Sequence, residues 1–217
     1  MEPLVSCICP TFNRREFIPR AIRCFLRQDW PNRELVILDD GTDPVADLVP
    51  NDPNIHYHRL EEKQCYAVKL NRLCELAQGE YILHFDDDDW HSPARITRQI
   101  SPLIGDSNFK ASGTSNIYYY KHGQKKAYEY RGKKDIWMGG IGYAKAFWQE
   151  HHFDSNKAPG ADTRWLRAHV PVGQRYDVAD PSLFICAIHA TNDSRKNVQS
   201  HQWGEVPWEK VAAIDQA

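Results

Sequence analysis

Four adjacent aspartates, Asp86 to Asp89, directly follow a short apolar segment at 81–85. Like charges this close raise one another's pKa unless a positive charge lies among them, so the run favours a bound divalent cation. Mg²⁺ and Mn²⁺ suit such oxygen ligands, since they take few protein carboxylates and complete their shell with water and phosphate oxygens. A solvated acidic turn is the alternative. The preceding strand favours a ligand site, because open α/β sheets bind ligands at the carboxyl ends of strands.

The apolar segment before the aspartates is one of several elements that alternate between strand and helix patterns. Short apolar runs predict buried strands, and the first of them is expected to stop at Pro10. Apolar residues with a helical period predict two amphipathic helices, with Gly79 capping the second. The expected strands are 4–9, 35–38, 54–59 and 81–85, and the expected helices are 16–27 and 64–78. This order predicts an α/β protein with a mostly parallel sheet flanked by helices.

The alternation weakens after Pro93, where the pattern becomes that of a small α+β portion. An antiparallel pair is expected around His122 and Gly123, and two helices follow it. The expected strands are 111–120 and 126–131, and the expected helices are 143–151 and 162–169. No repeat or linker divides the sequence, so we expect all 217 residues to form a single domain.

Composition gives no sign of a nucleic-acid partner. The formal net charge is −2 and the sequence pI is about 6.5, so there is no broad basic field. The six cysteines form no C-x-x-C pair, which favours a reducing compartment. No signal stretch and no run of about 18 apolar residues is present, so we expect a cytoplasmic protein without a transmembrane segment. Trp203 and Trp208 leave peripheral membrane contact open.

Short motifs follow the expected strands in a specific order, although each motif alone is weak. Together they resemble the family 2 glycosyltransferases of the GT-A fold, a Rossmann-like fold, over roughly residues 4 to 195. The resemblance implies a nucleotide-sugar binding half at 1–92, an acceptor-side half at 93–200 and a C-terminal tail at 201–217. The motifs are Pro10-Thr11-Phe12-Asn13-Arg14, Asp39-Asp40-Gly41, Asn71 with Gly79-Glu80-Tyr81, Phe85-Asp86-Asp87-Asp88-Asp89-Trp90, and Ala161-Asp162-Thr163 with Arg167.

The resemblance implies a nucleotide diphosphate sugar donor, expected to be a UDP-sugar, and a divalent cation, Mn²⁺ or Mg²⁺. Asp39 matches a carboxylate that accepts a hydrogen bond from uracil, although Asp-Gly alone is typical of a turn. Asp88 matches a metal ligand and His189 a second one, although a lone histidine is more often structural. The implied nucleotide-binding residues are Pro10, Thr11, Phe12, Arg14, Asp39, Asn71, Asp86, Asp87 and Arg195.

The resemblance also implies that Asp162 is the catalytic base. It would take the proton of the acceptor hydroxyl in one displacement that inverts the anomeric centre, while the cation offsets charge on the leaving diphosphate. Ala161 stands where the family usually has a glutamate, which weakens any role for that first acidic residue. Asp162 also suits a helix cap, and the two roles are compatible. The implied acceptor-binding residues are Trp137, Gly139 and Gly140.

Two other functions are weighed against an inverting glycosyltransferase. Ala161 favours a non-catalytic module that binds a nucleotide sugar or a divalent cation. A nucleotidyltransferase would need a glycine-rich basic phosphate loop after the first strand, and residues 10–14 are not one. The acceptor is left open as a glycan, a lipid-linked molecule or another small acceptor, in bacterial-type polysaccharide or glycoconjugate synthesis.

Overall fold

The computed structural model describes residues 2–131, 135–136, 140–156, 160–192 and 196–216. Its strands are β1 Val5–Thr11, β2 Arg33–Asp39, β3 Ile55–Arg59, β4 Tyr81–His84, β5 Trp90–His91, β6 Ala111–Gly113, β7 Asn116–Lys121, β8 Ala127–Arg131, β9 Gly142–Ala144, β10 Arg175–Asp177, β11 Phe184–Ile188 and β12 Trp203–Val206. Its α-helices are α1 Ile18–Leu26, α2 Tyr66–Leu76, α3 Arg95–Gly105, α4 Lys145–Glu150 and α5 Ala161–His169.

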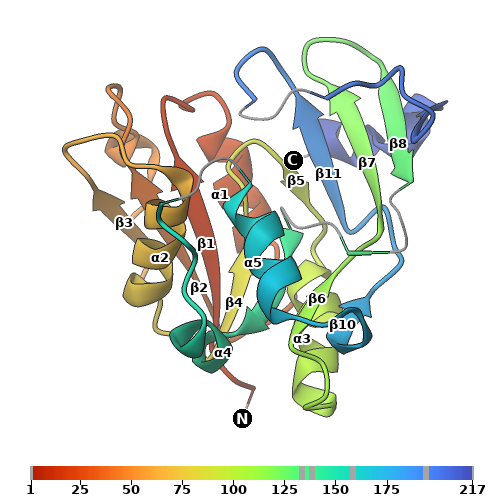
Figure 1. The fold of residues 1–217 in the computed structure, drawn as a ribbon. Helices are drawn as coiled ribbons and strands as arrows, with labels where there is room; N and C mark the ends of the chain where they lie inside the picture. Colours follow the sequence, from red (N-terminus) through yellow and green to blue (C-terminus); the bar gives the residue numbers. More distant parts are fainter. Residues whose placement is uncertain (1, 132–134, 137–139, 157–159, 193–195, 217) are drawn as a thin grey trace.

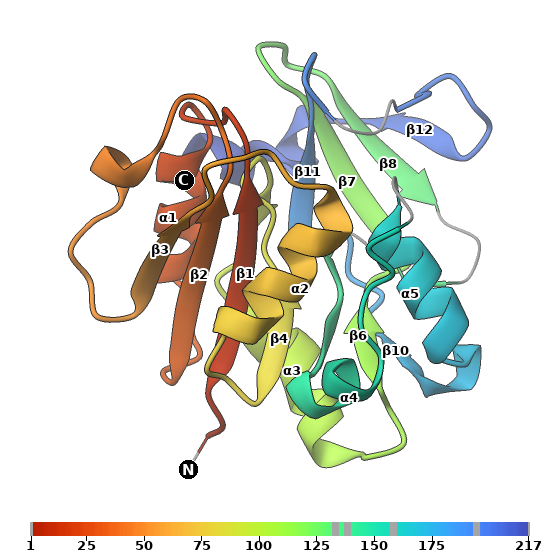
Figure 2. The ribbon, with the colours of Figure 1, turned by 60° about the vertical axis from the view of Figure 1, so that its left-hand side comes forward.

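A seven-stranded sheet forms the centre of the molecule, in the order β10-β6-β9-β4-β1-β2-β3. The strands from β4 to β3 run parallel, and β9 is antiparallel to both β4 and β6. Helices cover both faces (Figures 1 and 2). The cluster on one face includes Phe25 of α1 and Ile100 of α3, and the cluster on the other includes Leu70 of α2 and Trp165 of α5. The expected α/β class is therefore confirmed.

Register brings the chemically interesting loops to one edge of this sheet. Thr11 at the end of β1 lies opposite Asp39 at the end of β2, and Ile8 lies opposite His84 at the end of β4. Parallel strands place their carboxyl ends at the same edge. The loops that begin after Thr11, Asp39 and His84 therefore emerge side by side.

A second, five-stranded sheet borders that edge, in the order β12-β8-β7-β11-β5. Only β11 and β7 pair in parallel, as expected for a more mixed second half. β5 follows the aspartates directly and pairs with β11 through Trp90 and Ile185. The second sheet is therefore joined to the acidic segment with no intervening residue.

Some element boundaries differ from those expected. β1 continues through Pro10, because this residue lies beyond the last β1–β4 pair and its missing N–H removes no ladder bond. The expected strand 111–120 is two strands in different sheets, β6 and β7, separated at Thr114 and Ser115. The expected helix 143–151 begins only at Lys145, because Tyr143 pairs with Ile82 in β9.

The C-terminal segment packs on the fold. β12 pairs with β8, and Val211 is fully buried in the cluster that contains Phe25. Trp208 is partly buried against the same cluster. Among the described residues, no helix has the length and apolar character needed to cross a bilayer.

Gly79 does not cap α2, which ends at Leu76 with Ala77 as its C-cap. A Cβ at Gly79 would lie 2.5 Å from Ser6 Oγ and 2.6 Å from the Leu4 carbonyl oxygen. We therefore expect Gly79→Ala to lower the free energy of unfolding by about 1–3 kcal/mol, the usual cost of overpacking. Urea unfolding followed by circular dichroism measures this change.

Gly173→Ala is the matched control, because nothing lies within 4 Å of a Cβ at Gly173. Its free energy of unfolding should stay within about 0.5 kcal/mol of the parent value. Equal stability of the two variants would contradict the close contact at Gly79.

Candidate active site

A cavity of about 740 Å³ lies at the carboxyl ends of β1 and β4, bordered by the second sheet and by α5. Side chains of both charges line it. The acidic ones are Asp86, Asp87, Asp88, Asp89 and Asp162, and the basic ones are Arg14, Lys63, Lys69 and Lys196. Cavities of this size hold small-molecule ligands, and this one combines acidic and basic groups around one space.

The acidic run at 86–89 is largely withdrawn from solvent. Burial, reinforced by the charges of Asp89, Asp88 and Asp87, raises the pKa of Asp86 well above its ordinary value. Burial and the neighbouring Asp88 charge raise the pKa of Asp87 to about 8. Asp87 Oδ2 is buried without a hydrogen-bond partner in the described part of the chain. A cation in the cavity would favour the ionised form of these carboxyl groups.

Asp89 joins the acidic run to β11. Its Oδ1 accepts a hydrogen bond from the Ala187 N–H at 3.0 Å, and its Oδ2 accepts one from Cys186 Sγ at 3.2 Å. Burial, with the charge of Asp88, raises the pKa of Asp89 to about 7. These bonds fix the loop and thereby orient Asp88.

Asp88 belongs to a cluster with Arg14 and His189. Asp88 Oδ2 lies 2.8 Å from His189 Nε2 and 3.6 Å from Arg14 Nη1. Arg14 Nη2 donates to the Thr191 carbonyl oxygen at 2.6 Å. The backbone N–H of His189 donates to Asn192 Oδ1 at 2.7 Å. This bond closes the turn that carries the imidazole. The structure thus brings together the two predicted metal ligands.

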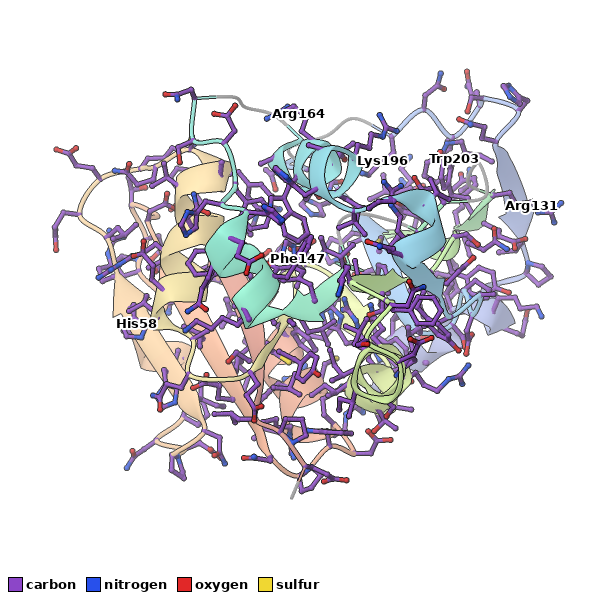
Figure 3. All side chains as sticks on the ribbon, turned by 60° about the horizontal axis from the view of Figure 1, so that its bottom comes forward. His58, Arg131, Phe147, Arg164, Lys196 and Trp203 are labelled. Carbon is purple, nitrogen blue, oxygen red and sulfur yellow. The ribbon has the colours of Figure 1, made fainter. Side chains whose placement is uncertain are left out.

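Asp162 faces the same cavity from the first turn of α5. Its Oδ1 accepts a hydrogen bond from the Thr163 N–H at 2.7 Å, whereas the N-cap position is occupied by Gly160 with φ of 79°. Burial raises the pKa of Asp162, and the positive charge of Lys196 acts in the opposite direction. Lys196 and α5 lie on the face that Figure 3 shows. A buried carboxyl of raised pKa is suited to proton transfer.

Asp39 is fully buried and its oxygens are engaged within the protein. They accept hydrogen bonds from the Gly41 N–H at 2.8 Å, the Val45 N–H at 3.0 Å and the Tyr57 hydroxyl at 2.9 Å. Asp39 therefore shapes the loop after β2 and does not line the cavity. Phe12 does line it, and Lys63 Nζ lies 3.9 Å from the centre of its ring.

Two further predicted residues have structural contacts outside the cavity. Asn71 donates to the Phe153 carbonyl oxygen at 2.9 Å and accepts from Trp148 Nε1 at 3.1 Å, which joins α2 to α4. Gly140 packs against Phe184, and its carbonyl oxygen accepts a hydrogen bond from Gln99 Nε2 at 2.7 Å. Trp137, Gly139 and Arg195 lie outside the described residues.

A buried ion pair, which was not predicted from the sequence, lies beside the cavity. Lys69 Nζ donates to Asp40 Oδ1 at 2.7 Å and to the Thr11 carbonyl oxygen at 3.0 Å. Asp40 Oδ2 accepts from the Gln64 N–H at 2.8 Å. The available signal was a lysine on the apolar face of the helix, between Tyr66 and Leu73.

The residues present fit a divalent cation. Asp88 and His189 offer a carboxylate oxygen and an imidazole nitrogen 2.8 Å apart, and Asp87 Oδ2 is a buried acceptor without a partner among the described residues. No group of three or more acidic, histidine or cysteine side chains within those residues could hold an ion alone. A cation here would need ligands from outside the protein, such as phosphate oxygens.

Comparisons with known proteins point in the same direction. A sequence profile described as Glycosyl transferase family 2 matches residues 6–153. The glycosyl transferase WcaA of Escherichia coli (strain K12), whose name refers to colanic acid biosynthesis, is 39% identical over 101 residues, covering 44% of this chain and 36% of that protein. TuaG of Bacillus subtilis (strain 168), whose name refers to teichuronic acid biosynthesis, is 36% identical over 108 residues, covering 48% and 43%. This chain thus matches less than half the length of either relative.

Solved structures show the same fold at low identity. TarS of S. aureus in complex with UDP-GlcNAc gives a TM-score of 0.71 at 16% identity, over 88% of this chain and 61% of that one. The mannosyltransferase PcManGT from Pyrobaculum calidifontis, in complex with GDP-Man and Mn²⁺, gives 0.66 at 17% identity, over 89% and 58%. The Rossmann-like GT-A architecture expected from the sequence is therefore confirmed.

Lys69→Met should destabilise the protein strongly. It leaves the Asp40 carboxylate buried without its counter-charge, which typically costs about 3–5 kcal/mol. Exchanging both residues, Lys69→Met with Asp40→Asn, should restore much of that loss because no charge remains buried. Urea unfolding of the single and double variants measures the difference.

Lys145→Met is the matched control, because the half-buried Lys145 Nζ donates only to the Ala77 carbonyl oxygen. It should cost less than Lys69→Met. A double variant no more stable than Lys69→Met alone would show that the ion pair is not the cause.

Proposed function

This chain belongs to glycosyl transferase family 2, and we propose that it is an inverting, metal-dependent enzyme that moves a sugar from a UDP-sugar to an acceptor hydroxyl. The donor would lie over the acidic run at 86–89, and the acceptor would approach from α5. The proposal takes Asp162 as the catalytic base and Asp88 with His189 as the protein ligands of the cation.

One observation carries this proposal: Asp162 and the aspartates after β4 line the same cavity. These positions lie more than 70 residues apart in the sequence. A single displacement needs a leaving group stabilised on one side and a base on the other. In this proposal the aspartates after β4 would serve the leaving group and Asp162 would serve as the base, and Asp162 is close enough for its charge to raise the pKa of Asp86.

The donor class is supported by the charge distribution and by the structural relatives. Arg14, Lys63, Lys69 and Lys196 give the cavity positive groups that suit a diphosphate. TarS has been solved with UDP and with UDP-GlcNAc, and PcManGT with GDP-Man and Mn²⁺. A nucleoside diphosphate, free or carrying a sugar, is the ligand class common to these structures.

Asp162 would act on the acceptor. Its ionised carboxylate takes the proton of the attacking hydroxyl, and the Thr163 N–H holds one carboxylate oxygen in place. The cation held by Asp88 and His189 would offset the negative charge that develops on the diphosphate. The protein forms no covalent bond to the sugar in such a displacement.

Ala161 does not argue against catalysis in this geometry. Its side chain is buried in the cluster that includes Trp165, and it is not among the residues that line the cavity. In the sequence, Ala161 is the one feature that favours a non-catalytic module. The carboxylate that faces the cavity, Asp162, is present.

The proposed process is the synthesis of a bacterial-type polysaccharide or glycoconjugate. WcaA and TuaG carry names that refer to such polymers, and a Campylobacter jejuni relative, 32% identical over 93 residues, is named as a glucosyltransferase acting on an undecaprenol-linked glycan. A glycan or a lipid-linked glycan is accordingly the proposed acceptor class, and cytoplasmic location stays part of this proposal.

Replacing the base tests the mechanism directly. Asp162→Asn should lower kcat for sugar transfer by about 10²–10⁴-fold, the usual contribution of a general base. Its affinity for UDP in the presence of Mn²⁺ should be nearly unchanged, because the substituted carboxylate faces the acceptor. Transfer by purified variants can be followed as UDP release from UDP-sugars, and binding by calorimetry.

Asp88→Asn is the complementary variant. It should lose the Mn²⁺-dependent part of UDP binding while the fold, measured by thermal unfolding, persists. An Asp162→Asn enzyme that transfers sugar at the parental rate would exclude the proposed base.

The pH dependence of transfer should report the buried base. Since burial raises the pKa of Asp162, kcat/KM should fall as the pH drops through a pKa above that of an exposed aspartate. Lys196 lowers this pKa, so Lys196→Met should move the acid limb to higher pH. Lys110→Met, at a half-buried lysine that donates to the Ser107 carbonyl oxygen and does not line the cavity, should leave the limb in place. A shift to lower pH in Lys196→Met would contradict the assignment.

A further inference from the structure

The guanidinium of Arg14 lies beside Asp88 and His189, the two residues proposed above as ligands of the cation. Its Nη1 is 2.9 Å from His189 Nε2 and 3.6 Å from Asp88 Oδ2. The three side chains are mostly buried, with exposed fractions of 11% for Arg14, 15% for Asp88 and 6% for His189. Solvent therefore screens their mutual interaction only weakly.

From this contact, and resting on the function proposed above, we infer that Arg14 is a built-in competitor of the divalent cation and couples cation binding to diphosphate binding. A guanidinium and a divalent cation at the same carboxylate repel each other strongly at such short range. Cation binding at Asp88 therefore requires Arg14 to move away from it.

The histidine must also change the partner of its ring nitrogens. In the structure, Nε2 lies 2.8 Å from Asp88 Oδ2 and 2.9 Å from Arg14 Nη1, and Nδ1 lies 3.1 Å from Arg14 Nη1. A metal ligand needs the Nε2 lone pair, so Nδ1 would then carry the ring proton. Thr191 Oγ1, at 3.0 Å from Nδ1, is placed to accept it once Arg14 has left.

The turn that carries His189 keeps its shape without Arg14. Asn192 accepts the His189 N–H at 2.7 Å and donates to the Ala187 carbonyl oxygen at 3.2 Å. Arg14 adds bonds to Thr191 and contacts with the imidazole itself. Release of the guanidinium therefore leaves in place the backbone turn that carries the imidazole.

A diphosphate supplies the alternative partner for Arg14. The side chain lines the cavity, where phosphate oxygens would accept charge-assisted hydrogen bonds from it. A diphosphate thus withdraws the competitor from Asp88 and strengthens cation binding, and by linkage the cation strengthens diphosphate binding to the same degree. Without a nucleotide, Arg14 keeps the cation affinity low.

Mn²⁺ titration of the protein without nucleotide, followed by electron paramagnetic resonance, tests this inference. Arg14→Gln and Arg14→Met remove the charge, and each should bind Mn²⁺ about ten-fold more tightly than the parent, since a close positive charge is lost. UDP should then increase their Mn²⁺ affinity by a smaller factor than in the parent. Arg14→Lys keeps the charge and should stay close to the parental Mn²⁺ affinity.

Arg15→Gln is the matched control, because the neighbouring Arg15 is directed to Asp47 on the surface and contacts no predicted metal ligand. It should bind Mn²⁺ like the parent. Neutral Arg14 variants that are folded by thermal unfolding and bind Mn²⁺ equally or more weakly would overturn the inference. A parental protein in which UDP has no effect on Mn²⁺ binding would overturn the inference together with the proposed function, whereas the Arg14 result alone overturns only the inference.

Discussion

The aspartates that end β4 place several negative charges inside the protein, and the surrounding structure is arranged around the cost of holding them there. Buried carboxylates without compensation are strongly unfavourable. Backbone and side-chain donors from β11 hold Asp89, the His189 turn and Arg14 hold Asp88, and Arg20 of α1 donates to the Asp88 carbonyl oxygen. These contacts do not neutralise all of the negative charge that the ionised carboxylates would carry, and the remainder would favour binding of a cation.

A second layer of polar contacts keeps the acidic loop from relaxing into the core. His91, two residues after Asp89, bonds to the Asp86 carbonyl oxygen through Nε2 at 3.0 Å and contacts Arg95 through Nδ1. Arg95 is almost fully buried, donates to the His84 carbonyl oxygen at 2.6 Å, and lies over the ring of Phe184. Burial and the Arg95 charge lower the pKa of His91 well below its ordinary value, so this histidine is neutral. The loop is thus clamped between β4, α3 and β11.

The two sheets divide the chemistry between them. The parallel strands of the large sheet deliver the loops after β1 and β4 to one edge, which is the usual ligand edge of such sheets. The second sheet and α5 then enclose this edge and bring in Cys186, His189 and Asp162 from the far end of the chain. Neither sheet therefore provides all residues of the site. The ion pair and hydrogen bonds that join the loop after β4 to β11 and the His189 turn agree with this.

Residues close together in the sequence determine most of the first-half secondary structure and the position of the acidic run. Apolar runs and helical periods placed β1, β2, β3, β4, α1 and α2, because a strand or an amphipathic helix is encoded in neighbouring residues. The acidic run after a strand likewise indicated a cation site, because charge repulsion acts between adjacent side chains. Only the tertiary structure decided that Asp162 faces that run and that Asp39 and Asn71 are engaged in internal hydrogen bonds. It also decided that Lys69 pairs with Asp40 and that Arg14 lies 3.6 Å from Asp88. Such contacts join segments far apart in the sequence, and their geometry is set by strand register and sheet packing, which no local pattern records.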